Sequence, residues 1–116
     1  MSLKMETDIS EDVVILYCAG RLVFGDETAA FRERIRNILL GTRHIVVNLS
    51  RIDYVDSGGL GTLVATLAST RQRHGEIKLV RPNQRVTELL HRTRLNTVFK
   101  SYESDEEAVT SFATNS

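Results

Sequence analysis

The segment Val55–Gly61, of sequence Val-Asp-Ser-Gly-Gly-Leu-Gly, lies between an apolar run and an amphipathic run. The apolar run, residues 45–49, predicts a buried strand. The run that follows has apolar residues at i, i+3, i+4, i+7 and i+8, which is the spacing of one helical face. These residues are Leu60, Leu63, Val64, Leu67 and Ala68. Ser57 therefore stands where a strand turns into a helix, at or next to the helix N-cap.

A serine in this position has three possible roles. As a structural cap it accepts a backbone N–H and stabilises the helix by about 1 kcal/mol. As a nucleophile it needs a strained elbow of the type Gly-x-Ser-x-Gly, but Val55 stands where that elbow has glycine. As a phosphorylation site it needs only exposure and local tolerance of a negative charge.

Catalysis and nucleotide binding find little support in the sequence. The histidines begin a strand or end helices, so none is visibly placed as a base for Ser57; they are His44, His74 and His91. The glycines Gly58–Gly61 form no Gly-x-x-x-x-Gly-Lys-Ser/Thr loop, and Asp56 would repel a bound phosphate. A small enzyme or nucleotide-binding protein that uses this backbone remains the reading from a different functional class.

Phosphorylation of Ser57 agrees best with the local physics. The N–H groups and the dipole at a helix start accept negative charge. A phosphoryl group would add about −1.5 to −2 charges beside Asp56 and would change what can dock there. The sequence therefore predicts a docking surface that carries a charge switch.

The order of the predicted elements indicates an α/β fold. Strands are expected at 4–9, 13–19, 44–49 and 77–80, with a short last strand at Val98-Phe99. Helices are expected at 26–40, with Asp26 as N-cap and Gly41 as end, at 57–73, after Asn83, and after Ser104. Strands that alternate with helices predict a mixed, mostly parallel sheet of four or five strands with about four helices.

Parallel strands have a useful consequence for the loops. The carboxyl ends of strands 13–19 and 44–49 should emerge at the same edge of the sheet. This places the loop Arg21–Asp26 near Ser57, at the edge where open α/β sheets usually bind ligands.

Length and composition bound the remaining possibilities. A chain of 116 residues fits one domain, and 15 Lys and Arg balance 15 Asp and Glu, so charge favours neither nucleic acid nor a membrane surface. The charge is uneven, with a net +6 over residues 71–100 and a net −4 over residues 101–116. Solvated helix faces explain this pattern, and a docking surface for a charged partner is the alternative.

The single cysteine, Cys18, rules out an internal disulfide and suits a reducing compartment. No apolar stretch approaches the ~20 residues of a membrane span, and no signal-peptide core is present. We expect a cytoplasmic protein with no cofactor and no metal. Residues 1–4 are interpreted as a cloning leader and residues 113–116 as a disordered tail.

At the motif described above the chain resembles the anti-sigma factor antagonists, which are members of the STAS domain family. In that family an apolar strand leads into Asp-Ser-Ser/Gly-Gly-Leu-Gly, here Asp56–Gly61. Residues 20–22 are similar to the family's Gly-x-Leu after its second strand. Residues 44–50, 75–79 and 85–99 are similar to its central strand, its next strand and its late helix with the following turn.

The resemblance implies a regulatory switch without enzymatic activity. The unmodified antagonist binds an anti-sigma factor, usually a serine kinase of the histidine-kinase-like ATPase type, and so frees a sigma factor. The kinase phosphorylates the serine that matches Ser57, the two proteins part, and a PP2C-like phosphatase resets the cycle. We expect a monomer or weak dimer. The alternative is a STAS subunit of another signalling or lipid-transport assembly, in which Ser57 is an unmodified helix cap.

The partner-binding surface expected from the motif and the neighbouring loop has nine residues: Arg21, Val23, Phe24, Asp56, Ser57, Gly58, Gly59, Leu60 and Gly61. Gly58 replaces the second serine of the family, and Val23 stands where many members carry an acidic residue. Phe24 is either an exposed contact beside Ser57 or folds back onto the helix 26–40.

Overall fold

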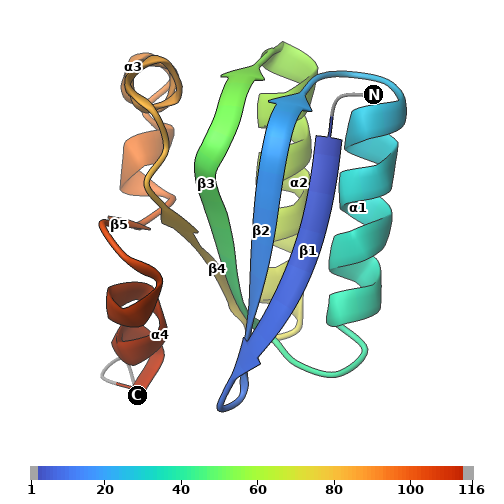
Figure 1. The fold of residues 1–116 in the computed structure, drawn as a ribbon, viewed down its shortest axis with the longest axis vertical. Coiled ribbons are helices and arrows are strands. Elements are labelled where there is room, and N and C mark those ends of the chain that lie inside the picture. The colour runs from blue at the N-terminus through green and yellow to red at the C-terminus, as the bar shows by residue number, and fades with distance from the viewer. Residues whose placement is uncertain (1–2, 114–116) are drawn as a thin grey trace.

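A computed structural model of the chain describes residues 3–113 (Figure 1). Five strands, four α-helices and one short 3-10 helix lie within these residues, which confirms the α/β class and the mixed sheet. In chain order the elements are β1 (Leu3–Ser10), β2 (Val13–Leu22), α1 (Asp26–Ile38), β3 (His44–Val55), α2 (Ser57–Gln72), β4 (Glu76–Val80), α3 (Gln84–Arg92), the 3-10 helix (Leu95–Thr97), β5 (Ser101–Tyr102) and α4 (Asp105–Ala113).

The sheet has the strand order β1-β2-β3-β4-β5. β1 runs antiparallel to β2, and every later pair of neighbours is parallel, as expected. In Figure 1 α2 lies behind the sheet and α1 stands beside it next to β1; both pack on the sheet through the larger apolar cluster, to which α3 adds Val86 and Leu90. α4 contributes Ala108 to a smaller cluster with Val46 and Val80, residues that alternate with the larger cluster along their strands. α4 therefore covers the opposite face.

Two strands are longer than predicted. The segment 50–55, which lies between the predicted strand 44–49 and the predicted helix 57–73 and is expected to be a loop, continues β3, and β2 continues from residue 19 to Leu22. The two extensions pair with each other, with register shifts near Cys18 and between Gly20 and Arg21. Polar residues in 50–55 resemble a loop, but hydrogen bonding to β2 holds them extended. The extension brings the end of β3 level with the end of β2.

Several predicted helix and strand boundaries are wrong by a few residues. The N-cap of α1 is Gly25, at φ 124°, and Asp26 is the first helical residue. α1 ends at Ile38, before the expected Gly41. The last strand is Ser101–Tyr102, whereas Phe99 at the expected position is buried in the core.

Other caps agree with the sequence. Asn83 caps α3, because its Oδ1 accepts the N–H of Val86 at 2.8 Å. Ser104 Oγ accepts the N–H of Glu107 at 3.1 Å at the start of α4, as expected where a glutamate follows a serine by three residues in a capping box. The returning bond differs, since Glu107 Oε1 accepts the N–H of Glu103 at 3.2 Å. Residues 1–2 and 114–116 of the expected leader and tail lie outside the described residues, whereas Leu3 and Lys4 belong to β1.

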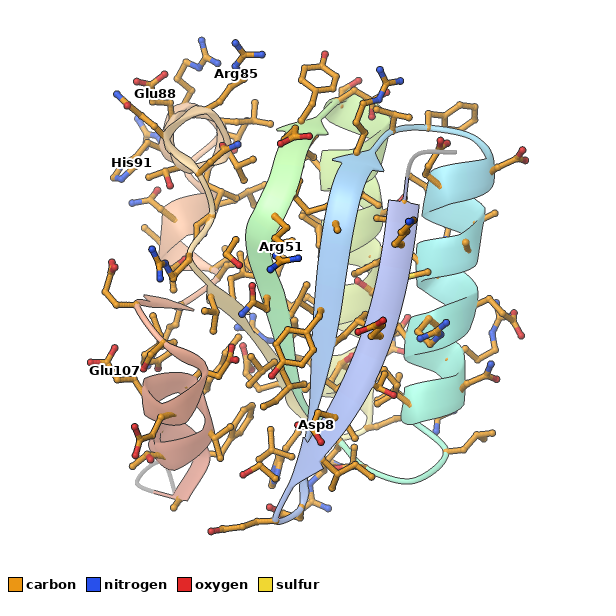
Figure 2. All side chains as sticks on the ribbon, viewed as in Figure 1. Asp8, Arg51, Arg85, Glu88, His91 and Glu107 are labelled. Atoms are coloured by element: carbon orange, nitrogen blue, oxygen red, sulfur yellow. The ribbon has the colours of Figure 1, made fainter. Side chains whose placement is uncertain are left out.

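A polar network joins α4 to the middle of the sheet. Asp105, the first residue of α4, accepts hydrogen bonds from Tyr17 Oη at 3.1 Å and from Asn48 Nδ2 at 2.7 Å. Burial, and then the bond to Asp105, raise the pKa of Tyr17. None of the described helices covers the sheet surface beside this network, and Arg51 of β3 and Asp8 of β1 lie there in Figure 2.

Candidate functional site

The loop after β2 and the start of α2 meet at one edge of the sheet, as the parallel topology predicts (Figure 1). The backbone N–H of Asp56 donates to the carbonyl of Leu22 at 3.3 Å. Both oxygens of the Asp56 carboxylate accept the N–H of Phe24, at 3.2 and 3.1 Å. Residues 22–24 are therefore tied directly to the residue that precedes Ser57.

Asp56, and not Ser57, is the N-cap of α2. Its backbone is extended, and its Oδ1 accepts the N–H of Gly59 at 2.7 Å, which satisfies one of the free donors at the helix start. Ser57 is the first helical residue, next to the N-cap, which confirms the predicted placement; of the three roles considered for it, that of the cap belongs to Asp56 instead. Both residue types are good caps, and the strand extension to Val55 decides which of them lies at the boundary.

The electrostatics of this cap are also set by the backbone. The N–H of Gly59, followed by that of Phe24, lowers the pKa of the Asp56 carboxyl against the opposing effect of burial. Asp56 is therefore a fixed negative charge at neutral pH, placed beside Ser57.

Ser57 is exposed, and its hydroxyl has no hydrogen-bond partner within the part of the chain that the structure describes. It projects from the first turn of a helix whose N-terminal N–H groups favour anions. The geometry leaves the hydroxyl accessible to a protein that approaches this edge.

The three glycines of the motif differ in whether packing within the chain requires glycine at that position. A Cβ on Gly59 would overlap the carbonyl oxygen of Leu22, so only glycine lets α2 approach β2 this closely. A Cβ on Gly58 would lie 2.5 Å from the Cβ of Phe24. A Cβ on Gly61 would meet nothing within 4 Å, so packing within the chain does not require glycine there.

The remaining predicted contact residues divide into exposed and buried ones. Phe24 is 81% exposed, which overturns the alternative that it folds back onto α1. Arg21 is exposed and Val23 is partly buried. Leu60 is only 8% exposed and belongs to the core, so its side chain is scaffold and not partner surface.

One surface residue at this edge escaped the sequence reasoning. Tyr54, near the end of β3, is 41% exposed and pairs with Arg21 of β2. The prediction of a loop over 50–56 hid it, and its only signal was an aromatic residue just before the motif. Phe24 and Tyr54 thus place two exposed aromatic rings on the segments next to Ser57.

The described residues include no group of three or more His, Cys, Asp or Glu side chains arranged to hold a metal ion. His44 begins β3 and His74 follows α2, so both lie at the opposite edge of the sheet from Ser57. His44 Nδ1 instead faces Asp12 Oδ2 at 3.1 Å. No described helix has the length and apolar character that a membrane span requires.

Residues 4–108 match the family model of the STAS domain. The chain belongs to the STAS domain family. It is 34% identical over 103 residues to the TM1081 homologue of Thermotoga neapolitana, whose name places it among anti-sigma factor antagonists; the match covers 87% of this chain and 90% of that protein.

Solved structures show the same STAS fold. The crystal structure of TM1081 from Thermotoga maritima superposes with a TM-score of 0.85 at 29% identity, over 92% of each chain. The anti-sigma factor antagonist SpoIIAA in its unphosphorylated form gives a TM-score of 0.73 over 99% of this chain and 100% of its own. At 15% identity this second likeness concerns the fold alone.

Proposed function

We propose that this STAS domain is an anti-sigma factor antagonist controlled by phosphorylation of Ser57. In its unmodified form it binds an anti-sigma factor serine kinase of the ATPase type in the cytoplasm and so releases a sigma factor. The kinase phosphorylates Ser57 and binding ends, and a PP2C-like phosphatase restores the active form. The domain itself is a binding module without catalytic activity.

The observation that carries this proposal is the exposed hydroxyl of Ser57 on the first turn of α2, which has no hydrogen-bond partner among residues 3–113 and lies beside the loop that Asp56 holds at Phe24. The names of relatives over most of the chain's length support the same role. The proposed docking surface consists of Arg21, Val23, Phe24, Asp56, Ser57, Gly58 and Gly61, with the backbone of Gly59 below it.

Phosphorylation is proposed to act through charge and not through refolding. Asp56 already occupies the N–H groups of Gly59 and Phe24, so a phosphoryl group on Ser57 would add a dianion next to a carboxylate. An interface fitted to a neutral hydroxyl would lose affinity, while the helix start tolerates the charge. Ser57→Asp should accordingly weaken kinase binding and leave the far-UV spectrum unchanged.

The direct test incubates the protein with the anti-sigma kinase of its own genome and ATP, and maps the product by mass spectrometry. One phosphate at Ser57 is expected. Ser57→Ala should abolish labelling and retain kinase binding. Ser69→Ala removes another exposed hydroxyl of α2 and should label normally. Labelling that persists in Ser57→Ala, or that maps to Ser50 or Thr62, would contradict the proposal.

The alternative function is that of a STAS subunit in another signalling or lipid-transport assembly. Hydrogen exchange on the kinase complex separates the two surfaces. Protection should cover residues 21–26 and 56–61 together. Protection confined to residues 71–100 would place the interface elsewhere, and genes for transport beside this one would favour the alternative.

A further inference from the structure

A pocket lies at the edge of the sheet opposite to Ser57, where β3 and β4 begin. It has a volume of about 400 Å³. Cationic and titratable side chains dominate its lining, with a single carboxylate among them. They are His44, Arg71, His74, Glu76, Lys78 and Lys100, joined by Phe112 of α4.

Lys78 forms the floor of this pocket and is only 1% exposed. Its Nζ donates to Ser111 Oγ at 2.7 Å and lies 4.3 Å from the ring centre of Phe112 and 5.7 Å from that of Tyr102. Within residues 3–113 no carboxylate forms an ion pair with it. Buried charges in proteins are normally paired, because desolvation of an isolated ion is costly. The basic side chain of Lys78 therefore lies under this pocket without a carboxylate partner among residues 3–113.

The charged side chains that line the pocket differ in whether they already have an ion-pair or hydrogen-bond partner. Arg71 forms a two-bond pair with Glu76, at 3.0 and 2.8 Å, so these two groups neutralise each other. His44 is held by Asp12 and by the ring of Phe112, with ring centres 4.8 Å apart. The side chains of Lys100 and His74 have no hydrogen-bond or ion-pair partner within the described residues. They are the groups that a ligand would meet first.

We infer that this pocket binds a small phosphorylated ligand, with its phosphate between Lys100 and His74 above the buried Lys78. A dianionic phosphate offers several acceptor oxygens and can bond to separate donors while it compensates the ammonium at the floor. A volume of about 400 Å³ falls within the ~300–1,000 Å³ of small-molecule sites, which leaves room for an organic group on the phosphate. The inference concerns a different surface from the proposed docking edge and is independent of it.

The ligand would also act on α4. Ser111 and Phe112, which contact Lys78, both belong to the last turns of this helix. Compensation of the Lys78 charge would strengthen the attachment of α4 to β4, so the bound form should be more stable than the free form.

The test is an NMR titration of the ¹⁵N-labelled chain with three probes: inorganic phosphate, inorganic pyrophosphate and AMP. Ionic strength is kept constant with sodium chloride. Saturable shifts are expected at the amides of residues 74–78, 100–102 and 111–112. Saturation by AMP alone would identify a phosphate carried on an organic group, and saturation by phosphate or pyrophosphate would identify a free oxyanion.

Three variants make the outcome decisive. Lys100→Ser changes only an exposed side chain and should weaken binding about tenfold, the loss of one charge-assisted hydrogen bond. Lys78→Met should weaken it at least as much. Lys4→Ser removes an exposed lysine of β1 outside the pocket and should bind as the parent does. Absence of saturable shifts with all three probes, shifts centred on residues 57–60, or equal affinity in Lys100→Ser and Lys4→Ser would overturn the inference.

Discussion

The capping role of Asp56 leads to a stability prediction that separates it from its neighbour. Asp56→Ala removes the acceptor of the Gly59 N–H and of the Phe24 N–H. Loss of a cap costs about 0.5–2 kcal/mol, and the second bond, near solvent, adds up to about 1 kcal/mol. We therefore expect the free energy of unfolding to fall by about 0.5–3 kcal/mol. Ser57→Ala removes an exposed hydroxyl that bonds to none of the described residues, and it should change the free energy of unfolding by less than about 0.5 kcal/mol.

Urea titration followed by far-UV circular dichroism measures both values, since the chain has no tryptophan. The slope of unfolding free energy against urea should stay constant across the set, because the folded state is unchanged. Asp56→Asn is the matched variant: it keeps an acceptor oxygen and loses the charge, so it should cost less than Asp56→Ala. A Ser57→Ala loss as large as that of Asp56→Ala would refute the assignment of the cap.

The pH dependence gives a second check on the same carboxylate. The folded state lowers the pKa of Asp56 below its ordinary value of 3.8. Its stabilising contribution is therefore complete above that value and disappears as pH falls through the folded pKa. The stability difference between the parent and Asp56→Asn should be constant from about pH 7 to pH 5 and should shrink towards pH 2. If this stability difference is independent of pH over the range, the negative charge of the Asp56 carboxylate does not contribute to folding stability.

Three further outcomes are expected. Phe24→Ala should weaken kinase binding without loss of stability, because the ring is 81% exposed. The matched control is Leu40→Ala, which changes a residue that is 79% exposed and follows the C-terminal end of α1. Equal losses of binding affinity in both variants would contradict the proposed docking surface. Gly61→Ala should raise the free energy of unfolding by about 0.5–1 kcal/mol, since the added methyl meets no atom within 4 Å and alanine favours a helix. Gly25→Ala should lower the free energy of unfolding, because φ is +124° at this residue. Calorimetry that finds Gly25→Ala more stable than Gly61→Ala would contradict these two backbone conformations. Burial raises the pKa of Cys18 to about 12, so iodoacetamide at about pH 8 should label the thiol only under denaturing conditions, and rapid labelling of the native protein would disagree with its burial.

The sequence predicted the fold and the location of the site because both depend on strong, local patterns. Apolar runs and helical spacing predicted the order of strands and helices, and parallel pairing predicted that the loop at Phe24 meets the start of α2. The motif at Ser57 predicted the family. None of these inferences required knowledge of a side-chain position.

Features that depend on one residue of register could not be predicted in the same way. The extension of β3 to Val55 depends on pairing with β2 across a register shift, which has no local signal in the polar segment 50–55. That extension decides that Asp56 and not Ser57 becomes the cap, and it exposes Tyr54 at the edge. Thr62, Thr66 and Thr70 were missed on the buried face of α2 because threonine scores as polar, although each hydroxyl bonds a carbonyl of its own helix.

Gly58, which replaces the family's second serine, is coupled in this structure to Phe24, the residue after the second departure at Val23. The Cβ of a residue at position 58 would lie 2.5 Å from the Cβ of Phe24, well inside normal contact. The missing second serine therefore makes room for the loop, which Asp56 then holds through the Phe24 N–H. Gly58→Ser, which restores the residue found in many family members, should push the loop away.

We expect this substitution to cost about 1 kcal/mol, at the low end for overpacking because an exposed loop can yield. The amides of residues 23–25 should shift, and the N–H of Phe24 should exchange faster as its bond to Asp56 lengthens. Gly61→Ser, three residues further along α2, adds the same side chain in open space and should leave the loop unchanged. Equal spectra of residues 23–25 in both variants would show that the glycine and the loop are independent, and that Val23-Phe24 takes its position for another reason. If the loop does move in Gly58→Ser alone, the outward placement of Phe24 depends on the glycine directly after Ser57.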